Sequence, residues 1–458
     1  MTAKFALSRR YYRRVLSRYL VFRALKPLVV FAVLAPHRLV QWLFGFRAVR
    51  IAWHYYLTYP VWWLKFYRTG GRARLVHLDD YRAAPGLRTT LVRRGETKIA
   101  ATPRYTNHEP PVRPVPRLVD QPPLEILEYA NATVIGATNF VVKDGLAIAP
   151  NDYDAARDFT HAEKIGGVYI RPARGEMLYS LEPPKRRDAA ICLLGHCAGN
   201  YAHFMTEVLT KLLVIDAHGG YDHLPLLIDQ WVPTEIKVIL KAFNTRGHDI
   251  IEVASGQPVT CTRLIDTTPP SYAPPDSRAY IERGQHVQMP ADVYRFDAYA
   301  LGLVRERAGE IVPPAANARG RRLYLQRRPS HYGNARAVVN SFNVEEILRR
   351  SGFDLIETGS MTIHEQIAAF RNAEIVVAPI GAAMTNLIFA PPGCRVLSLS
   401  AIHKNADYAY WTNMMAALGH DLRYLVGPQV SKGGNPMHRD FRIPLDDLQR
   451  ALDALDCR

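Results

Sequence analysis

The sequence predicts an α/β protein built from two β-α-β domains. Strand-like and helix-like stretches alternate from residue 189 to residue 253. A Pro-rich connection follows at 266–278, and the same alternation restarts beyond residue 320. Alternation of this kind is typical of parallel sheets covered by helices. We expect a crevice between the two domains, because open parallel sheets bind ligands beyond the carboxyl ends of their strands.

The first domain is predicted from short apolar, β-branched runs separated by helical patterns. Between residues 125 and 180 the runs are short, and Asp144-Gly145 is a hairpin signal. Further on, we expect strands at 189–195, 224–231 and 249–253, with helices at 201–217 and 234–243.

The second domain carries clearer helix boundaries. Asn343 is expected to cap a helix that stops at Gly352. Thr362 and Glu365 have the spacing of a capping box, and a short helix is expected from about Met384. The strands are expected at 322–327, 353–358, 375–379 and 395–400.

A chain of 458 residues is longer than a single hydrophobic core usually supports. Residues 79–124 are polar and Pro-rich, which predicts a linker. The expected organisation is a basic segment at 1–78, this linker, a first Rossmann-like domain at 125–305 and a second at 306–458.

Positive charge is concentrated in residues 1–78. That segment has 15 Lys or Arg and no Asp or Glu, whereas the rest has 43 basic and 42 acidic residues. It also holds four of the six tryptophans. Around residues 10–20, apolar and aromatic side chains follow helical spacing, and Arg10, Arg14 and Arg18 fall on the opposite side. A basic amphipathic helix of this kind favours an anionic membrane surface. A nucleic-acid-binding tail is the alternative, and we expect no nucleic-acid partner.

Other features of the sequence indicate the cellular compartment. The most apolar run, residues 28–35, lies between two prolines and is too short to span a bilayer. Five scattered cysteines without a C-x-x-C pair indicate a reducing compartment. We therefore expect a cytoplasmic protein associated peripherally with the inner face of a membrane.

The stretch 374–393 predicts a strand that breaks at Pro379 into Gly381 and two alanines. Small residues beyond a strand allow a ligand to approach the backbone closely. A helix beginning there would direct its unpaired N–H groups at that ligand. The stretch therefore predicts a phosphate site, in which Thr385 and Asn386 are candidate contacts.

A second candidate site lies on the helix expected at 201–217. Asn200, His203, Glu207 and Lys211 share one helical face, while Tyr201 falls on the core-facing stripe. An imidazole and a carboxylate at i, i+4 could form an acid–base pair, with Glu207 taking the proton of an attacking hydroxyl and His203 orienting it.

A zinc site is the competing interpretation of this stretch. It would use His196, Cys197, His203 and Glu207, but the spacing lacks an H-E-x-x-H pattern, and we expect no metal. In the second domain, Arg327 and Arg328 end a strand, where guanidinium groups suit a diphosphate.

These stretches resemble glycosyltransferase family 61, also called DUF563, which includes bacterial capsular-polysaccharide enzymes. Two motifs carry the resemblance. The first is matched by Asn200, Tyr201, His203, Phe204, Glu207, Leu209, Lys211 and Leu212. The second is matched by Arg327-Arg328, Gly352-Phe353, Glu365-Gln366, the run from Gly381 to Asn386, Phe389 and Pro391-Pro392-Gly393. Many members have His where this chain has Ile380, and Ala383 replaces a glycine.

The resemblance implies a GT-B fold of two Rossmann-like domains and an inverting, metal-independent sugar transfer. It implies no cofactor, a nucleotide-sugar donor expected to carry UDP, and a polysaccharide or glycolipid acceptor. The expected catalytic residues are Glu207 and His203. The expected donor-binding residues are Arg327, Arg328, Glu365, Gln366, Gly381, Thr385 and Asn386, of which Glu365 or Gln366 would reach the ribose or base. A non-catalytic nucleotide-binding subunit and a zinc hydrolase are the alternatives.

Overall fold

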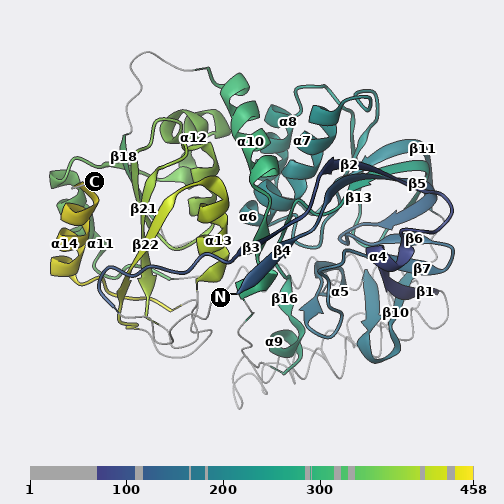
Figure 1. Ribbon diagram of the computed structural model, residues 1–458, viewed down its shortest axis with the longest axis horizontal. Helices are drawn as coiled ribbons and strands as arrows, with labels where there is room; N and C mark the ends of the chain where they lie inside the picture. Colours follow the sequence, from purple (N-terminus) through teal and green to yellow (C-terminus); the bar gives the residue numbers. More distant parts are fainter. Residues whose placement is uncertain are drawn as a thin grey trace, which may run out of the picture.

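The computed structural model describes residues 70–108, 117–164, 167–180, 184–283, 289, 291–313, 321–327, 336–402, 408–430 and 439–456. These residues form two sheet-based lobes that lie side by side (Figure 1). We call them the N-terminal lobe, on an eleven-stranded sheet, and the C-terminal lobe, on a five-stranded sheet. The predicted α/β class is confirmed.

Four strands of the N-terminal sheet are parallel and lie in the order β13-β12-β11-β14. In chain order this is 3-2-1-4, the arrangement of one half of a doubly wound sheet. The order reverses between β11 and β14, where a ligand crevice is expected at the carboxyl ends. These strands are β11 (Lys185–Cys192), β12 (Leu226–Asp229), β13 (Ile250–Val253) and β14 (Pro258–Thr267).

The rest of this sheet is largely antiparallel and begins where β5 pairs with β14. The turn between β6 and β7 is the predicted hairpin, with positive φ at Asp144 (51°) and Gly145 (75°). The strands are β1 (Gly70–His77), β2 (Leu87–Arg93), β5 (Leu124–Ile135), β6 (Val141–Lys143), β7 (Leu146–Ala149), β9 (Val168–Arg171) and β10 (Glu176–Ser180).

Helices and short strands complete the N-terminal lobe. The connection 266–278, expected to be a linker, contains two of these short strands, so it belongs to the fold. The helices are α4 (Leu78–Tyr81), α5 (His161–Lys164), η2 (Pro172–Arg174), α6 (Tyr201–His203), η3 (Phe204–Val208), α7 (Leu209–His218), α8 (Thr234–Phe243), α9 (Arg278–Arg283) and η4 (Ala291–Val293). The short strands are β3 (Glu96–Ile99), β4 (Leu118–Gln121), β8 (Asp158–Phe159), β15 (Ser271–Tyr272), β16 (Asp276–Ser277) and β17 (Arg295–Phe296).

The C-terminal sheet is wholly parallel, in the order β19-β18-β20-β21-β22. In chain order this is 2-1-3-4-5, with the reversal between β18 and β20. The strands are β18 (Arg322–Leu325), β19 (Asp354–Ile356), β20 (Ile375–Pro379), β21 (Arg395–Ala401) and β22 (Asp421–Gly427). The helices are α11 (Ser341–Arg350), η5 (Thr358–Ser360), α12 (Ile363–Phe370), η6 (Ala382–Phe389), α13 (Ala409–Leu418) and α14 (Leu445–Asp456).

Local signals in this lobe gave mixed results. The capping box of Thr362 and Glu365 is confirmed, and Gly352 follows the end of α11 with φ 76°. The predicted cap at Asn343 is wrong, because α11 begins at Ser341, after Asn340. The helix expected from about Met384 begins at Ala382 and is a 3₁₀ helix.

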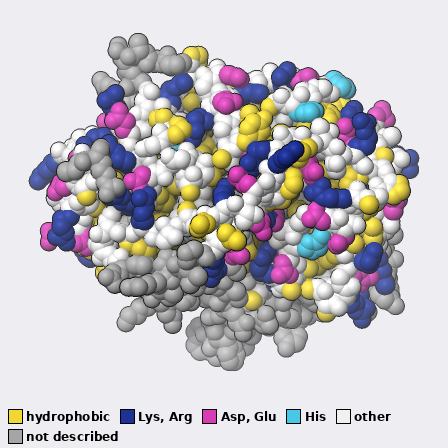
Figure 2. Space-filling model, in the orientation of Figure 1, with side chains coloured by type: hydrophobic (Ala, Val, Ile, Leu, Met, Phe, Trp, Pro, Cys, Tyr) yellow, Lys and Arg dark blue, Asp and Glu magenta, His cyan; other side chains and the backbone are white. Residues whose placement is uncertain are grey.

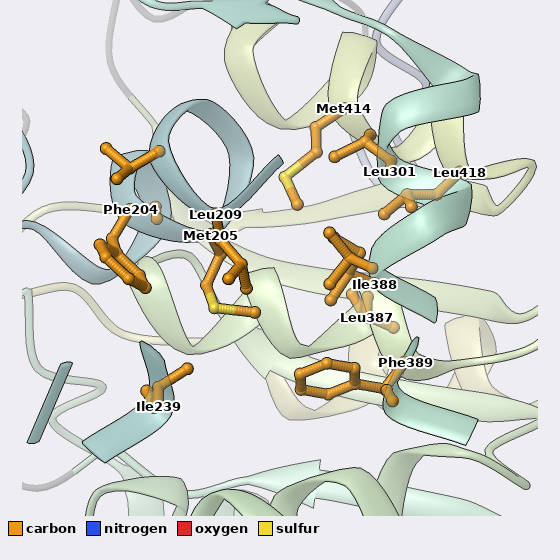
Figure 3. Packing of buried hydrophobic residues seen from close by; sticks show 14 of the residues in the cluster. Phe204, Met205, Leu209, Ile239, Leu301, Leu387, Ile388, Phe389, Met414 and Leu418 are labelled. Atoms are coloured by element: carbon orange, nitrogen blue, oxygen red, sulfur yellow. The ribbon is translucent and has the colours of Figure 1, made fainter. Parts of the chain in front are cut away.

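The two lobes share one hydrophobic core around α10 (Ala298–Ile311), which lies between them in Figure 1. Phe243 and Phe389 stack with ring centroids 6.4 Å apart. Burial of apolar area is the main favourable term in such packing, so this core joins the two lobes. Figure 3 shows Phe204, Met205, Leu209 and Ile239 of the N-terminal lobe, Leu301 of α10, and Leu387, Ile388, Phe389, Met414 and Leu418 of the C-terminal lobe.

Residues 79–124, expected to be a linker, are built into both lobes. β2 pairs with β5, whereas Tyr105 forms a parallel bridge with Tyr424 of β22. Next to this bridge, the Asn107 side chain accepts from the Val426 N–H (3.0 Å) and donates to its carbonyl (2.9 Å). Main-chain pairing with a sheet edge does not depend on an apolar sequence, which is why composition alone suggested a linker.

The basic segment expected at 1–78 lies mostly outside the described residues. Its last part, Gly70–His77, is strand β1 of the N-terminal sheet. In the part of the chain that the structure describes, none of the helices combines the length and apolar character needed to cross a bilayer. The expected domain boundaries stay predictions, although α10 runs across the one drawn between residues 305 and 306.

Candidate active site

The helix that carries Glu207 begins beyond the carboxyl end of β11. Asn200 caps it, since its side chain accepts from the Ala202 N–H at 3.0 Å. The sequence predicts one continuous α-helix, but Phe204–Val208 is a π-helical turn between α6 and α7. Single π turns inside helices are frequent at functional sites, and this one contains Glu207.

His203 and Glu207 form the expected pair, with 2.7 Å between His203 Nδ1 and Glu207 Oε1. The backbone N–H of Ala273, which follows β14, donates to the same oxygen at 3.2 Å. Glu207 therefore lies where the strand order of the N-terminal sheet reverses. Oε1 already accepts bonds from the protein, whereas Oε2 accepts none from the described residues. The second oxygen is placed to take a proton.

Charge stabilises the protonated form of His203. Burial of the imidazole opposes its charge, but the Glu207 carboxylate outweighs this effect, and the pKa of His203 is raised. Each side chain is 16% exposed. The pair is thus partly shielded from water, a setting in which the hydrogen bond to the carboxylate is strengthened.

Other residues on the expected helical face have structural partners. Lys211 Nζ forms a buried ion pair with Asp266 Oδ1 at 2.7 Å. Tyr201 packs against the shared core, as the core-facing stripe predicts. Its hydroxyl reaches into the C-terminal lobe, where it hydrogen-bonds Asn386 Oδ1 and lies 3.4 Å from Gln366 Oε1.

The expected anion site lies at the reversal between β18 and β20, where the structure brings Arg327 and Gly381 together. Arg327 Nη1 donates to the carbonyl of Ile380 at 3.0 Å. A Cβ added at Gly381 would overlap the Arg327 guanidinium, so a larger residue at this position would displace the guanidinium. Ala382 is exposed and Ala383 half-buried, which leaves the first turn of η6 open. The first N–H groups of a helix have no partner within it.

Arg336 is a site residue that sequence reasoning missed. Its Nε is buried and has no hydrogen-bond partner within the described residues. Burial, and then the positive charge of Arg327, lower the pKa of Arg336 to about 10. A cation held in this way is ready for an anionic ligand. The signal was a third arginine in the stretch that contains Arg327. Arg328 lies outside the described residues.

Other expected donor contacts have internal roles. Glu365 is exposed and completes the capping box with Thr362, while Gln366 Nε2 donates to the carbonyls of Thr358 (3.1 Å) and Met361 (3.0 Å). The side chains of Thr385 and Asn386 are almost fully buried, at 0% and 1% exposure. Contacts of these four side chains with a donor stay predictions.

The side chains proposed for a zinc site do not form one. His196 Nδ1 lies 2.7 Å from Asn139 Oδ1, and burial lowers the pKa of His196 to about 4. Burial likewise raises the pKa of Cys197 to about 12. Within the described ranges, no three His, Cys, Asp or Glu side chains are grouped as metal ligands.

Both halves of the site fall in one matched segment. The model of the family Glycosyltransferase 61 matches residues 201–397. The match begins at the Tyr201 contact, includes the His203–Glu207 pair and the Arg327–Gly381 corner, and ends in β21. It supports a glycosyltransferase, which uses a sugar donor and an acceptor, in agreement with the resemblance expected from the two motifs. No curated protein matches the chain.

Replacing His203 tests the coupling within the catalytic pair. Because the pKa of His203 is raised in the folded state, the pair stabilises the fold below about pH 6.5, the ordinary value for histidine. This contribution is lost as the pH rises through the raised pKa. Melting temperatures of wild type and His203→Gln should therefore differ most near pH 6 and converge towards pH 9. A difference independent of pH would contradict the coupling.

Arg336→Gln tests the anion site. Inorganic pyrophosphate should raise the melting temperature of the wild type, because it binds only the folded state. The variant should lose most of this shift. Without pyrophosphate it should be as stable as the wild type or more so, since a buried like charge beside Arg327 is gone. Arg349→Gln, on the exposed face of α11, serves as the control. Equal pyrophosphate shifts in all three proteins would exclude Arg336 from the site.

Proposed function

We propose that the protein is an inverting, metal-independent glycosyltransferase of GT-B architecture. It would move a hexose or pentose from a nucleotide sugar, with UDP as the expected nucleotide, to a polysaccharide or glycolipid. Capsular-polysaccharide synthesis is the expected setting. One observation carries the proposal: Glu207, a carboxylate with one unused oxygen, and the arginine corner of Arg327 and Arg336 each lie at the strand-order reversal of a different lobe.

The two lobes would divide the chemistry. Arg327, Arg336 and the open first turn of η6 would hold the diphosphate and meet the charge that develops on it. Glu207 Oε2 would take the proton of the acceptor hydroxyl. The acceptor oxygen then bonds to the anomeric carbon as the bond to the diphosphate oxygen breaks, and the leaving diphosphate keeps the electron pair. Attack from the opposite face inverts the anomeric centre.

His203 would hold the base in position. Its bond to Oε1, together with that of the Ala273 N–H, fixes the carboxylate and leaves Oε2 without a bond from the described residues. The raised pKa of His203 keeps a positive charge beside the carboxylate.

The decisive experiment combines donor binding with turnover of Glu207→Gln. A thermal-shift screen of nucleotide sugars identifies the donor, because a ligand bound to the folded state raises the melting temperature. The variant should keep that shift, since the donor corner is intact. It should lose about 10²–10⁴-fold in nucleoside diphosphate release, the usual contribution of a general base.

Glu374→Gln provides the matched control. Glu374 is an exposed carboxylate that pairs with Arg321 just before β20. This variant should turn over normally. Near-normal turnover in Glu207→Gln would contradict the assignment of Glu207 as the base. Donor binding without consumption by the wild type would favour the alternative, a non-catalytic nucleotide-binding subunit.

We propose further that the basic segment at 1–78 holds the protein on the cytoplasmic, inner face of a membrane. Residues beyond 78 are nearly balanced in charge, and Figure 2 shows Lys and Arg interspersed with Asp and Glu over one face of the molecule. The full chain should bind vesicles containing phosphatidylserine more strongly than neutral ones. Replacing Arg10, Arg14 and Arg18 with Gln should weaken that preference. Equal binding to both vesicle types, or to neither, would exclude the membrane role.

A further inference from the structure

Tyr410, in the first turn of α13, brings a C-terminal-lobe side chain up to the catalytic pair. The ring centroids of Tyr410 and His203 are 6.4 Å apart. Glu207, after burial, is the strongest influence on the acidity of Tyr410, and raises its pKa. Tyr410 therefore lies beside the proposed base.

Packing fixes the orientation of this ring. It meets Tyr294, Phe296 and Trp411 edge-on, at centroid distances of 5.7, 5.2 and 4.8 Å. Edge-on aromatic pairs each add to the stability of a defined arrangement. A side chain held on three sides cannot readily swing its hydroxyl away, so the position of the hydroxyl is preset.

The hydroxyl of Tyr410 is buried and has no hydrogen-bond partner within the described residues. Thr206 lies beside the hydroxyl, since its side chain lowers the pKa of Tyr410, and it donates its own proton to the carbonyl of Ala202 at 2.8 Å. A buried donor left unpaired destabilises the fold, and such groups in folded proteins call for an explanation. A ligand oxygen that enters the gap would pair with it.

We propose that Tyr410 is an acceptor-binding residue whose hydroxyl donates a hydrogen bond to the acceptor while Glu207 Oε2 receives the proton of the attacking hydroxyl. This inference rests on the proposed function. Two separate polar groups in one gap suit an acceptor with two neighbouring oxygens. A sugar ring with adjacent hydroxyls meets this requirement, whereas a lone alcohol does not.

The test is Tyr410→Phe, which keeps the ring packing and removes only the hydroxyl. With the donor found by the thermal-shift screen and a set of methyl glycosides as acceptors, kcat/KM for the acceptor should fall about 10-fold, as for the loss of one hydrogen bond. Donor binding by calorimetry should not change. Transfer to water, measured as donor hydrolysis without acceptor, should also persist, because water needs no second contact.

Stability separates this role from a structural one. Removing an unpaired buried hydroxyl is neutral or stabilising, so the melting temperature of Tyr410→Phe should equal or exceed that of the wild type. Tyr408→Phe is the matched control, because the Tyr408 hydroxyl donates to the carbonyl of Ala401. That variant should melt at a lower temperature and keep its transfer activity.

Three results would overturn the inference: a lower melting temperature for Tyr410→Phe, unchanged transfer to methyl glycosides, or hydrolysis that falls in parallel with transfer. Failure of the proposed function is recognised separately, by normal turnover in Glu207→Gln or by the absence of any nucleotide sugar that is consumed. In that case the melting temperatures still test whether the Tyr410 hydroxyl is unpaired, since a destabilised Tyr410→Phe means that the hydroxyl is bonded within the protein.

Discussion

The packing of the Glu207 helix against η6 fixes how the two halves of the site face each other. Phe204 and Met205 enter the same core as Leu387 and Ile388. At its edge, the Tyr201 hydroxyl bonds to Asn386. Close-packed interiors resist small displacements, so the base and the donor corner hold a preset relation without a ligand. Positioning of this kind is a large part of what catalysis requires.

Burying the arginine side chains of the C-terminal lobe costs free energy. Burial lowers the pKa of both Arg327 and Arg336, and for Arg336 the charge of Arg327 adds to the effect. A buried structural cation usually has a carboxylate partner, as Lys211 has in Asp266. Arg336 instead keeps a buried Nε without a partner in the described chain. An anionic ligand that accepts from this Nε would offset this cost.

The sequence was most informative where the interactions are local. The capping box at Thr362, the Asp144-Gly145 turn and the His203–Glu207 pair each depend on residues at most four apart, and each is present. The failures depend on contacts between distant segments. Periodicity could not show that Tyr201 reaches Asn386, because the two residues belong to different lobes and their contact depends on how the lobes pack. The π turn at Phe204–Val208 and the pairing of Asn107 with β22 likewise result from tertiary packing.

The position of Ile380 shows why a departure from a motif can leave a site intact. Many members of the family that the motifs resemble have His here, so a His contact to the donor is either missing in this chain or supplied elsewhere. The Ile380 side chain, however, is 6% exposed and belongs to the core shared by the two lobes. Its carbonyl accepts the bond from Arg327, and any residue type supplies that group. The contact that holds Arg327 against Gly381 therefore comes from the main chain, and the exchange at 380 alters the packing behind the corner while leaving that contact in place.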